Sequence, residues 1–267
     1  MLRLSNISEE EINKNMSRLT RFLEACSYQI DDDRIIIYIN ELKKQFEPET
    51  VRKHITTIKR FLKFINYPSV ELIKPPKVPK KRKLVIKPIH VRNLIHEIDQ
   101  KVRYEPLRLR AKAAVLLATT SGLRAMEVYK LMIDDIDVRN RTVFVRAEIA
   151  KDYEERITFF NEEAKQALED YLATNPSSNL FYNLRDAFEK IDSKLRMKHM
   201  RKFFSQQSDR LGMPTAIKKI LMGHVVGNEE YVALRGVDVD LEHYDFQDEE
   251  ELKKIYDKYW RDFKILD

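Results

Sequence analysis

Apolar residues recur at helical spacing in three successive stretches at the start of the chain. The spacing predicts helices over residues 8–28, about 31–46 and from Pro48 to Ile65. The residues of the first helix expected to face inward are Ile12, Met16, Leu19, Phe22 and Leu23. The third helix carries basic residues on its other face, namely Arg52, Lys53, Lys59, Arg60 and Lys63. A solvated face is the ordinary explanation for these charges, and a surface that binds a polyanion is the alternative.

A proline-rich basic stretch follows the three helices. Residues 74–88 contain four prolines and no acidic residue, so they cannot form a helix and are expected to be extended. Their central basic residues are Lys77, Lys80, Lys81, Arg82 and Lys83. An extended basic segment suits a strap across a polyanion, because each cation near a phosphate releases condensed counterions; a solubilising linker is the alternative. We expect a helical domain over 1–73, a linker over 74–87 and a second domain over 88–267.

The second domain combines helical spacing with one short region of alternating apolar and polar residues. The alternation predicts a small antiparallel sheet with strands near 133–138, 142–147 and 155–159. The predicted helices are 88–99, 106–118, 124–131, 161–174, 183–209, 214–222 and 248–263. The last has an aromatic face, for which folding back on its own domain is the ordinary explanation. The fold class expected is therefore mainly α with a small antiparallel β-sheet.

Composition limits the classes of protein that fit. The chain has 267 residues, 43% apolar and 34% charged, which is enough for two domains with buried cores. No apolar run approaches the ~20 residues that span a bilayer, and the first residues do not resemble a signal peptide. A single cysteine, Cys26, excludes an internal disulfide and a cysteine metal cluster. The net charge of +6 is compatible with nucleic acid. We expect a cytoplasmic protein without metal or other cofactor.

The stretch from Thr119 to Leu131 offers the first candidate for chemistry. An apolar run leads into a turn containing Gly122, and a helical pattern resumes just after Arg124. Free backbone N–H groups at a helix start and a planar guanidinium suit a phosphate. An exposed arginine at an ordinary helix start is the alternative.

Four further segments carry groups that could act on a bound phosphate. They are Lys151 in a predicted hairpin turn, Lys198 and Arg201 on one helix face, His224 after a helix, and Tyr244 before the last helix. Each has an ordinary explanation: a turn lysine, a basic helix face, a helix stop and a core aromatic. Their occurrence together and in this order favours a shared site.

These residues carry a resemblance to a known family. TSGLRAMEVYKLMIDDID, the lysine hairpin, KHMR, LMGH and HY followed by EEELKKIYDKYW resemble the tyrosine recombinase (phage integrase) family, closest to archaeal and archaeal-virus integrases. The resemblance covers about residue 88 to the end, and the N-terminal helices are similar to the family's core-binding domain. Lys198 stands where the family usually has a histidine, and Arg201 precedes His224 by the usual 23 residues.

The resemblance implies a site-specific DNA recombinase that needs neither metal nor ATP. In this family a tyrosine attacks a DNA phosphodiester and forms a 3′-phosphotyrosyl bond. Arg124 and Arg201 would hold the phosphate, Lys151 would protonate the leaving oxygen, and His224 would donate a hydrogen bond. Lys198 would contact the phosphate or assist proton transfer. Glu127 and Asp135 match the family's pattern as structural residues.

The position of the nucleophile departs from the family's pattern. The tyrosine commonly follows the GH pair by about nine residues, but this chain has Ala233 there. Tyr231 and Tyr244 flank that position. We favour Tyr244, because the residues after it resemble those after the nucleophile in related sequences.

The resemblance also implies partners and alternatives. The partner is double-stranded DNA, bound by a homotetramer on paired sites, with exchange of the C-terminal helix between protomers as one arrangement. A catalytically inactive DNA-binding relative and a type IB topoisomerase are the alternative functions.

Overall fold

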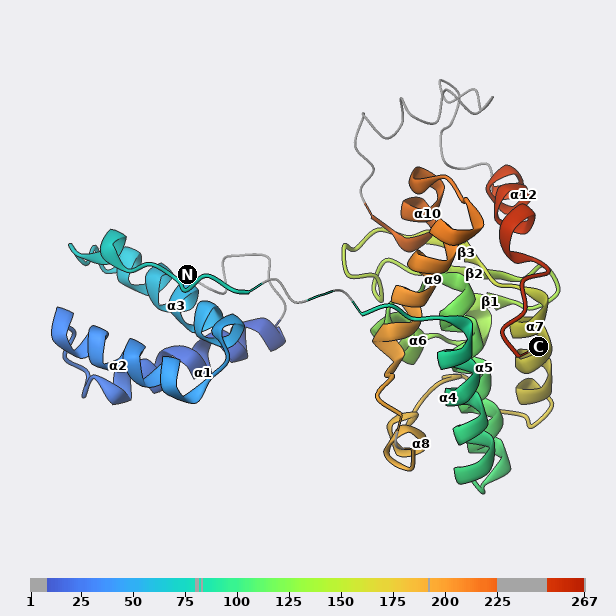
Figure 1. Ribbon diagram of the computed structural model, residues 1–267, viewed down its shortest axis with the longest axis horizontal. Helices are drawn as coiled ribbons and strands as arrows, with labels where there is room; N and C mark the ends of the chain where they lie inside the picture. The colour runs from blue at the N-terminus through green and yellow to red at the C-terminus, as the bar shows by residue number, and fades with distance from the viewer. Residues whose placement is uncertain (1–8, 80–81, 83, 192, 225–248, 267) are drawn as a thin grey trace. The chain divides into compact units, whose positions relative to one another are not determined.

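The computed structural model describes residues 9–79, 82, 84–191, 193–224 and 249–266. The chain divides into two compact units, Met1–Lys83 and Leu84–Asp267, and the division falls inside the proline-rich basic stretch (Figure 1). The predicted fold class is confirmed, because the described residues form mainly helices and one three-stranded antiparallel sheet. None of the described helices is long and apolar enough to cross a membrane.

The N-terminal unit is a small helical domain. It consists of α1 (Glu9–Ala25), α2 (Asp32–Gln45), α3 (Pro48–Phe64) and the short 3-10 helix η2 (Val70–Leu72). Its core contains the fully buried side chains of Phe22, Ile55, Ile58 and Leu62. The start of α2 is capped by Asp31, whose carboxylate accepts a hydrogen bond from the backbone N–H of Arg34 at 2.8 Å.

One expectation about the inward face of α1 is wrong. Met16 was expected in the core but is 49% exposed, whereas the neighbouring Asn15 is buried. The carboxamide oxygen of Asn15 accepts a hydrogen bond of 2.8 Å from the hydroxyl of Thr57 on α3. A polar pair therefore occupies the seam between α1 and α3, and because its groups satisfy each other, its burial carries little penalty.

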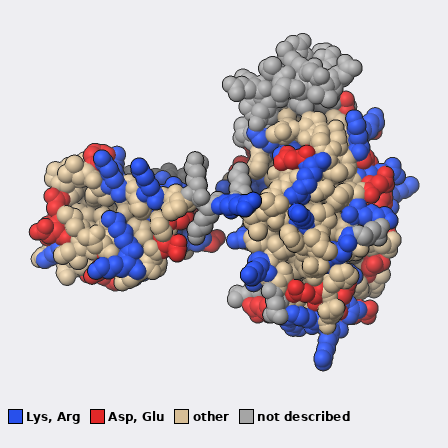
Figure 2. All heavy atoms as spheres, in the orientation of Figure 1, with Lys and Arg blue, Asp and Glu red and all other residues tan. Residues whose placement is uncertain are grey.

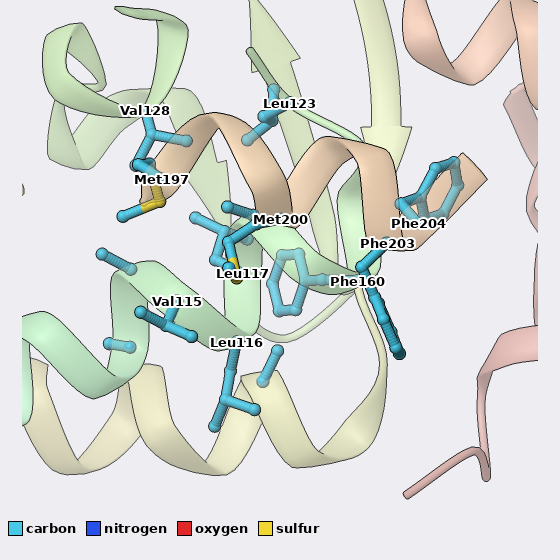
Figure 3. Packing of buried hydrophobic residues seen from close by; sticks show 14 of the residues in the cluster. Val115, Leu116, Leu117, Leu123, Val128, Phe160, Met197, Met200, Phe203 and Phe204 are labelled. Carbon is cyan, nitrogen blue, oxygen red and sulfur yellow. The ribbon is translucent and has the colours of Figure 1, made fainter. Parts of the chain in front are cut away.

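The C-terminal unit is built around α5 (Glu105–Ser121). Residues 113–121 of this helix are all buried, because helices lie against it on several sides. These neighbours are α4 (Pro88–Lys101), α7 (Glu162–Leu172) and α9 (Met197–Leu211). Figure 3 shows Val115, Leu116 and Leu117 of α5 within this core, with Met200 and Phe203 of α9 close by. The buried α5 delivers the chain to Gly122 and Arg124 from a rigid base.

A small antiparallel sheet adjoins the end of α5. Its strands are β1 (Ile136–Asp137), β2 (Thr142–Val145) and β3 (Arg156–Phe159), in the order β1-β2-β3. The Thr158 hydroxyl donates to the carbonyl of Ser121 at 2.7 Å and so ties β3 to the last residue of α5. The first predicted strand is shorter than expected, because residues Ile133–Asp135 form the 3-10 helix η3.

The predicted continuous helix over 183–209 is wrong. The chain forms α8 (Arg185–Glu189), leaves the helix, and starts α9 at Met197. Ser193 turns the chain by donating its backbone N–H to Glu97 of α4 at 3.1 Å. Buried Ile191, Leu195 and Met197 keep the segment apolar, so its spacing resembles that of a helix.

The C-terminal helix folds on its own domain. The unit also contains α6 (Ala125–Lys130), α10 (Thr215–Met222) and α12 (Glu249–Trp260), and both α10 and α12 lie against α9 and β3. Trp260 is fully buried and stacks on Phe204 of α9, with ring centroids 5.0 Å apart. The Tyr256 hydroxyl donates to the carbonyl of Thr120 at 2.9 Å. In this chain the aromatic face packs on its own domain; an exchange of the helix between protomers stays a prediction.

Candidate active site

The turn after α5 places Arg124 with little freedom. Gly122 ends the helix with a φ of 70°, a left-handed conformation that suits glycine. A Cβ atom at this position would lie 2.5 Å from the ring of Phe204, so the turn is packed directly on α9. Arg124 precedes α6, and its backbone N–H donates to the Glu127 carboxylate at 2.7 Å. The glycine-assisted turn predicted from the sequence is therefore also a tightly packed one.

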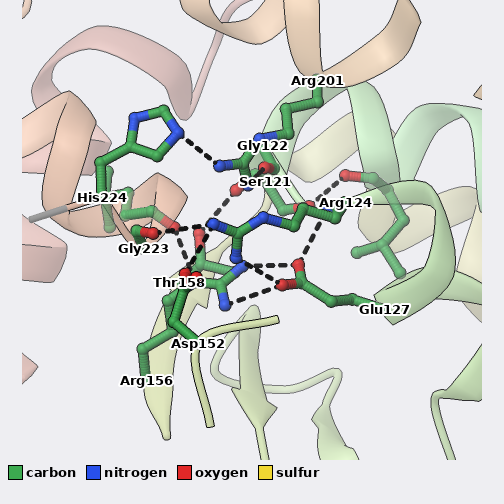
Figure 4. A network of polar contacts seen from close by, with 12 residues as sticks. Ser121, Gly122, Arg124, Glu127, Asp152, Arg156, Thr158, Arg201, Gly223 and His224 are labelled. Carbon is green, nitrogen blue, oxygen red and sulfur yellow. Dashed lines mark hydrogen bonds and ion pairs between the residues drawn. The ribbon is translucent and has the colours of Figure 1, made fainter. Parts of the chain in front are cut away.

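The guanidinium of Arg124 joins three segments of the chain (Figure 4). Its Nη1 lies 3.0 Å from Oε1 of Glu127. Its Nη2 donates to Oδ2 of Asp152 at 2.9 Å and to the carbonyl of Gly223 at 3.0 Å. The side chain is 20% exposed, so it is held from behind and is still reachable from solvent.

Arg201 reaches the same turn from α9. Its Nη1 donates to the carbonyl of Gly122 at 2.8 Å, and its Nη2 lies 2.8 Å from Nε2 of His224. Burial, and then the charge of Arg124, lower the pKa of Arg201 to about 10. Arg201 is still charged at neutral pH. Two guanidiniums thus lie in one site, and an anion that binds there would relieve their repulsion.

His224 is neutral in this arrangement. Burial, followed by the charges of Arg201 and Arg124, lowers the pKa of its imidazole. Because an arginine only donates hydrogen bonds, Nε2 of His224 must act as the acceptor towards Arg201. The structure therefore brings Arg124, Arg201 and His224 together through direct contacts and a shared turn.

The two candidate lysines lie at the margins of this cluster. Lys151 is exposed in the turn between β2 and β3, next to Asp152, which contacts Arg124. Lys198 is exposed in the first turn of α9, one turn before Arg201. The neighbouring His199 has a local task instead, since its Nδ1 accepts the backbone N–H of Arg196 at 2.9 Å.

Two site residues were missed by the sequence analysis. Asp152 pairs with Arg124, as described above, and Arg156 of β3 pairs with Glu127. The Arg156 Nη1 and Nη2 atoms lie 3.1 and 2.6 Å from the two Glu127 oxygens. Burial acts to raise the pKa of Glu127, but Arg156, with help from Arg124, outweighs it and lowers this pKa. The sequence marked neither residue, because a charge in a turn or at a strand end is common.

The residues expected to be structural do have structural contacts. Asp135 accepts the backbone N–H of Met132 at 2.8 Å and pairs with Arg146 at 2.7 Å. Glu127 is only 1% exposed. Within the described ranges, no three His, Cys, Asp or Glu side chains gather in a way that could hold a metal ion.

Comparison with known proteins identifies the family. The model of the phage integrase family matches residues 85–225, more than half of the 267-residue chain. The chain belongs to the phage integrase family. The tyrosine recombinase XerA of Saccharolobus solfataricus is 31% identical over 192 residues, which cover 68% of this chain and 62% of that relative. The resemblance inferred from the sequence motifs is confirmed.

Solved integrases share the fold. The Tn1549 transposon integrase, in complex with a circular intermediate DNA, matches with a TM-score of 0.65 at 16% identity, over 88% of this chain and 91% of that one. A lambda integrase tetramer bound to a Holliday junction matches with a TM-score of 0.65 at 12% identity, over 86% and 73% of the two chains. At identities of 12–16%, these matches show that the chain shares the fold of the solved integrases.

The basic residues expected to bind DNA are exposed or half-buried but partly paired. On α3, Lys63 and Lys59 lie 2.7 and 3.5 Å from Glu71, while Arg52 and Lys53 lie 3.4 and 3.9 Å from Glu49. Arg60 pairs with no carboxylate in the described part of the chain. Figure 2 shows basic and acidic side chains interspersed over the visible face of this unit.

The remaining predicted residues belong to the linker and to the segment before α12. Lys77 and Arg82 of the predicted linker are exposed. Lys80, Lys81 and Lys83 lie outside the described residues, as do both candidate nucleophiles, Tyr231 and Tyr244.

Proposed function

We propose that this protein is a site-specific DNA recombinase that cuts and rejoins DNA through a 3′-phosphotyrosyl intermediate. The observation that carries the proposal is the meeting of Arg124 and Arg201 at one turn, with His224 beside them. Two fixed guanidiniums suit the charge that develops on the non-bridging oxygens of a phosphoryl transition state. Membership of the phage integrase family supports the same activity.

The proposed reaction combines these groups with a tyrosine nucleophile. The tyrosine oxygen attacks the scissile phosphorus, its proton leaves to a base or water, and the bond to the 5′-oxygen breaks. Lys151, at the turn that borders Arg124, gives its proton to that departing oxygen. The phosphotyrosyl bond retains the energy of the broken ester, so a 5′-hydroxyl of another strand can reverse the step without ATP.

Phosphate binding requires a rearrangement of two present contacts. Asp152 now accepts from Arg124, and Nε2 of His224 now accepts from Arg201. A phosphate between the guanidiniums would replace the Asp152 carboxylate. It would also favour the protonated imidazole, whose Nε2–H then donates to a phosphate oxygen. Lys198, one turn before Arg201, extends the positive surface towards the DNA.

The two units divide the work on double-stranded DNA. We assign residues 1–73 to a DNA-binding domain that uses Arg52, Lys53, Lys59, Arg60 and Lys63, with the basic linker over 74–87 as a strap. The catalytic domain follows from residue 88. The lambda integrase tetramer on a Holliday junction supports a homotetramer on paired sites.

Covalent capture on nicked duplexes tests the proposal. The substrate is a pool of duplexes with randomised sequence and a nick near the centre. Cleavage close to the nick releases a short fragment that carries the 5′-hydroxyl, so the strand cannot be rejoined and the protein stays attached to the DNA. We expect a denaturing gel to show an attached product for the wild type and for Tyr231→Phe, but none for Tyr244→Phe. Loss with Tyr231→Phe alone would move the nucleophile to Tyr231. DNA binding without any product would indicate an inactive relative, and site-independent relaxation of supercoils would indicate a topoisomerase.

A further inference from the structure

Arg156 is a buried arginine at the base of the candidate active site. Its side chain is 10% exposed, and its guanidinium faces the carboxylate of Glu127, which is 1% exposed. The two Nη atoms contact the two carboxylate oxygens, which is the paired geometry that makes arginine–carboxylate contacts strong. The same carboxylate also accepts from the Nη1 and the backbone N–H of Arg124. Glu127 is therefore shared between a buried arginine and one that faces solvent.

Arg156 also contacts the segment that carries His224. Its Nε donates to the carbonyl of Leu221 at 3.3 Å. A Cβ atom on Gly223 would lie 2.9 Å from the Arg156 side chain, so this arginine and the glycine before His224 are in close packing. Figure 4 shows Arg156 between Gly223 and Glu127. One side chain thus connects the helix that follows Arg124 with the helix end that precedes His224.

The charges of the cluster explain what this connection does. Arg124, Arg156 and Arg201 carry three positive charges, and Glu127 carries one negative charge in contact with two of them. As long as Arg156 occupies both oxygens of Glu127, its charge balances the carboxylate, and the charge of Arg124 remains available to an anion. Without Arg156, the buried carboxylate would have Arg124 as its main counter-ion. That pair would be close to neutral and would hold a phosphate weakly.

We propose that Arg156 is a positioning residue, which neutralises Glu127 so that the guanidinium of Arg124 stays oriented and charged towards the scissile phosphate. The inference rests on the proposed function, because it takes Arg124 as a phosphate ligand. Arg156 would act through its contact with Glu127 rather than on the phosphate itself.

Removing the charge of Arg156, and then that of Glu127 as well, tests whether Arg156 acts by neutralising Glu127. In Arg156→Leu, Glu127 pairs with Arg124 alone, and we expect capture of the nicked duplex pool to fall by about 100-fold, as for a misplaced catalytic group. In the double variant Arg156→Leu, Glu127→Gln, the competing carboxylate is gone, and capture should recover by roughly tenfold, within the range of coupling energies between contacting residues. Arg156→Lys keeps the charge without the two-pronged geometry and should lie between the wild type and Arg156→Leu.

A merely structural role predicts a different pattern. If Arg156 only stabilised the fold, removing a second buried partner would not restore capture, and activity would follow the melting temperatures of the variants. The proposal is therefore overturned if the double variant captures no more DNA than Arg156→Leu while both are folded by circular dichroism.

Binding of inorganic phosphate separates this inference from the proposed function. The probe needs neither a nucleophile nor a target sequence, and the ring signal of His224 in an NMR titration reports occupancy. We expect phosphate to bind about tenfold more weakly to Arg156→Leu than to the wild type, and the double variant to regain most of the loss. Equal affinity in all three proteins contradicts the role of Arg156, whether or not the wild type cuts DNA. Absence of covalent capture by the wild type, with this affinity pattern intact, would contradict only the proposed recombination.

Discussion

Positive charge is organised in opposite ways in the two units of this protein. In the C-terminal unit, Arg124, Arg156 and Arg201 are fixed by contacts of 2.6–3.3 Å to carboxylates, backbone carbonyls and a histidine. On α3 of the N-terminal unit, Arg52, Lys53 and Lys63 are more than half exposed, and the basic side chains pair with Glu49 or Glu71, or with no carboxylate of the described chain. A fixed guanidinium can stabilise one charge distribution at one place. A loose cation can follow a DNA backbone and is screened by salt.

The largest expected effect comes from changing the geometry of a fixed guanidinium while keeping its charge. Arg124→Lys loses the planar fork that contacts Glu127, Asp152 and Gly223. We expect the rate of covalent capture to fall by about 10²–10³-fold, with DNA binding nearly unchanged. Arg103→Lys, at an exposed position between α4 and α5, is the matched control and should retain the wild-type rate. A wild-type rate in Arg124→Lys would show that charge alone suffices.

Substitutions of two glycines with left-handed backbone test how tightly the turn before Arg124 is packed. Gly122 and Gly212 both end helices with positive φ, but only Gly122 faces a side chain where a Cβ would go. Gly122→Ala should lower the free energy of unfolding by about 1–3 kcal/mol more than Gly212→Ala. Both variants strain a left-handed backbone, but only the new Cβ at position 122 overlaps a side chain, that of Phe204. Urea unfolding measures both values, and equal losses would refute the tight packing of this turn.

The contact of Asp152 with Arg124 predicts a smaller gain of function. Asp152 is half exposed, so its pair with Arg124 is worth little and competes with phosphate. Asp152→Asn should bind inorganic phosphate about two- to fivefold more tightly than the wild type at low salt. Glu154→Gln removes a charge from the same turn and serves as the control. Equal gains in both variants would point to general electrostatics rather than to competition at Arg124.

DNA binding by the basic residues of α3 should depend on their charge and on the salt concentration rather than on the shape of the side chain. Arg60→Ala should weaken DNA binding a few-fold and reduce the slope of log affinity against log salt by about 1, and Arg60→Lys should restore both. Titrations of labelled duplex at several salt concentrations give the slope. An unchanged slope would remove Arg60 from the DNA interface.

The lowered pKa of His224 predicts the sign of a pH effect on stability. Because its folded pKa lies below the unfolded value of ~6.5, the folded protein binds fewer protons, and this site loses stability as pH falls through ~6.5. The decline in unfolding free energy between about pH 7.5 and 5.5 should be shallower in His224→Gln than in the wild type. A steeper decline in the variant would mean that His224 gains, rather than loses, proton affinity on folding.

Much of the fold could be predicted from the spacing of apolar residues, and the wrong predictions have physical causes. The helices around α5 were predictable because their apolar stripes face a single core. The break before α9 was not, because Ile191, Leu195 and Met197 are buried although the backbone is not helical. Asn15 was missed for a related reason: its burial depends on Thr57, a partner distant in sequence.

The candidate site was predictable in its members but not in its connections. Arg124, Arg201 and His224 stand in motifs with recognisable order, so their association could be expected. Arg156 and Asp152 gain their importance only from contacts between β3, the hairpin turn and α6, which no local pattern encodes. The catalytic roles assigned to the three motif residues, and to Lys151, Lys198 and Tyr244, stay predictions.

The most direct test of the contrast between the fixed arginines of the candidate site and the exposed cations of α3 compares one variant of each. The measured quantity is the rate of covalent attachment per bound duplex. We expect Arg201→Ala to bind duplexes nearly as well as the wild type but to attach about 10²–10³-fold more slowly. Arg60→Ala should bind a few-fold more weakly and attach at the wild-type rate once saturated. If both variants lose binding and attachment in parallel, the division between a site that performs chemistry and a surface that holds DNA is wrong.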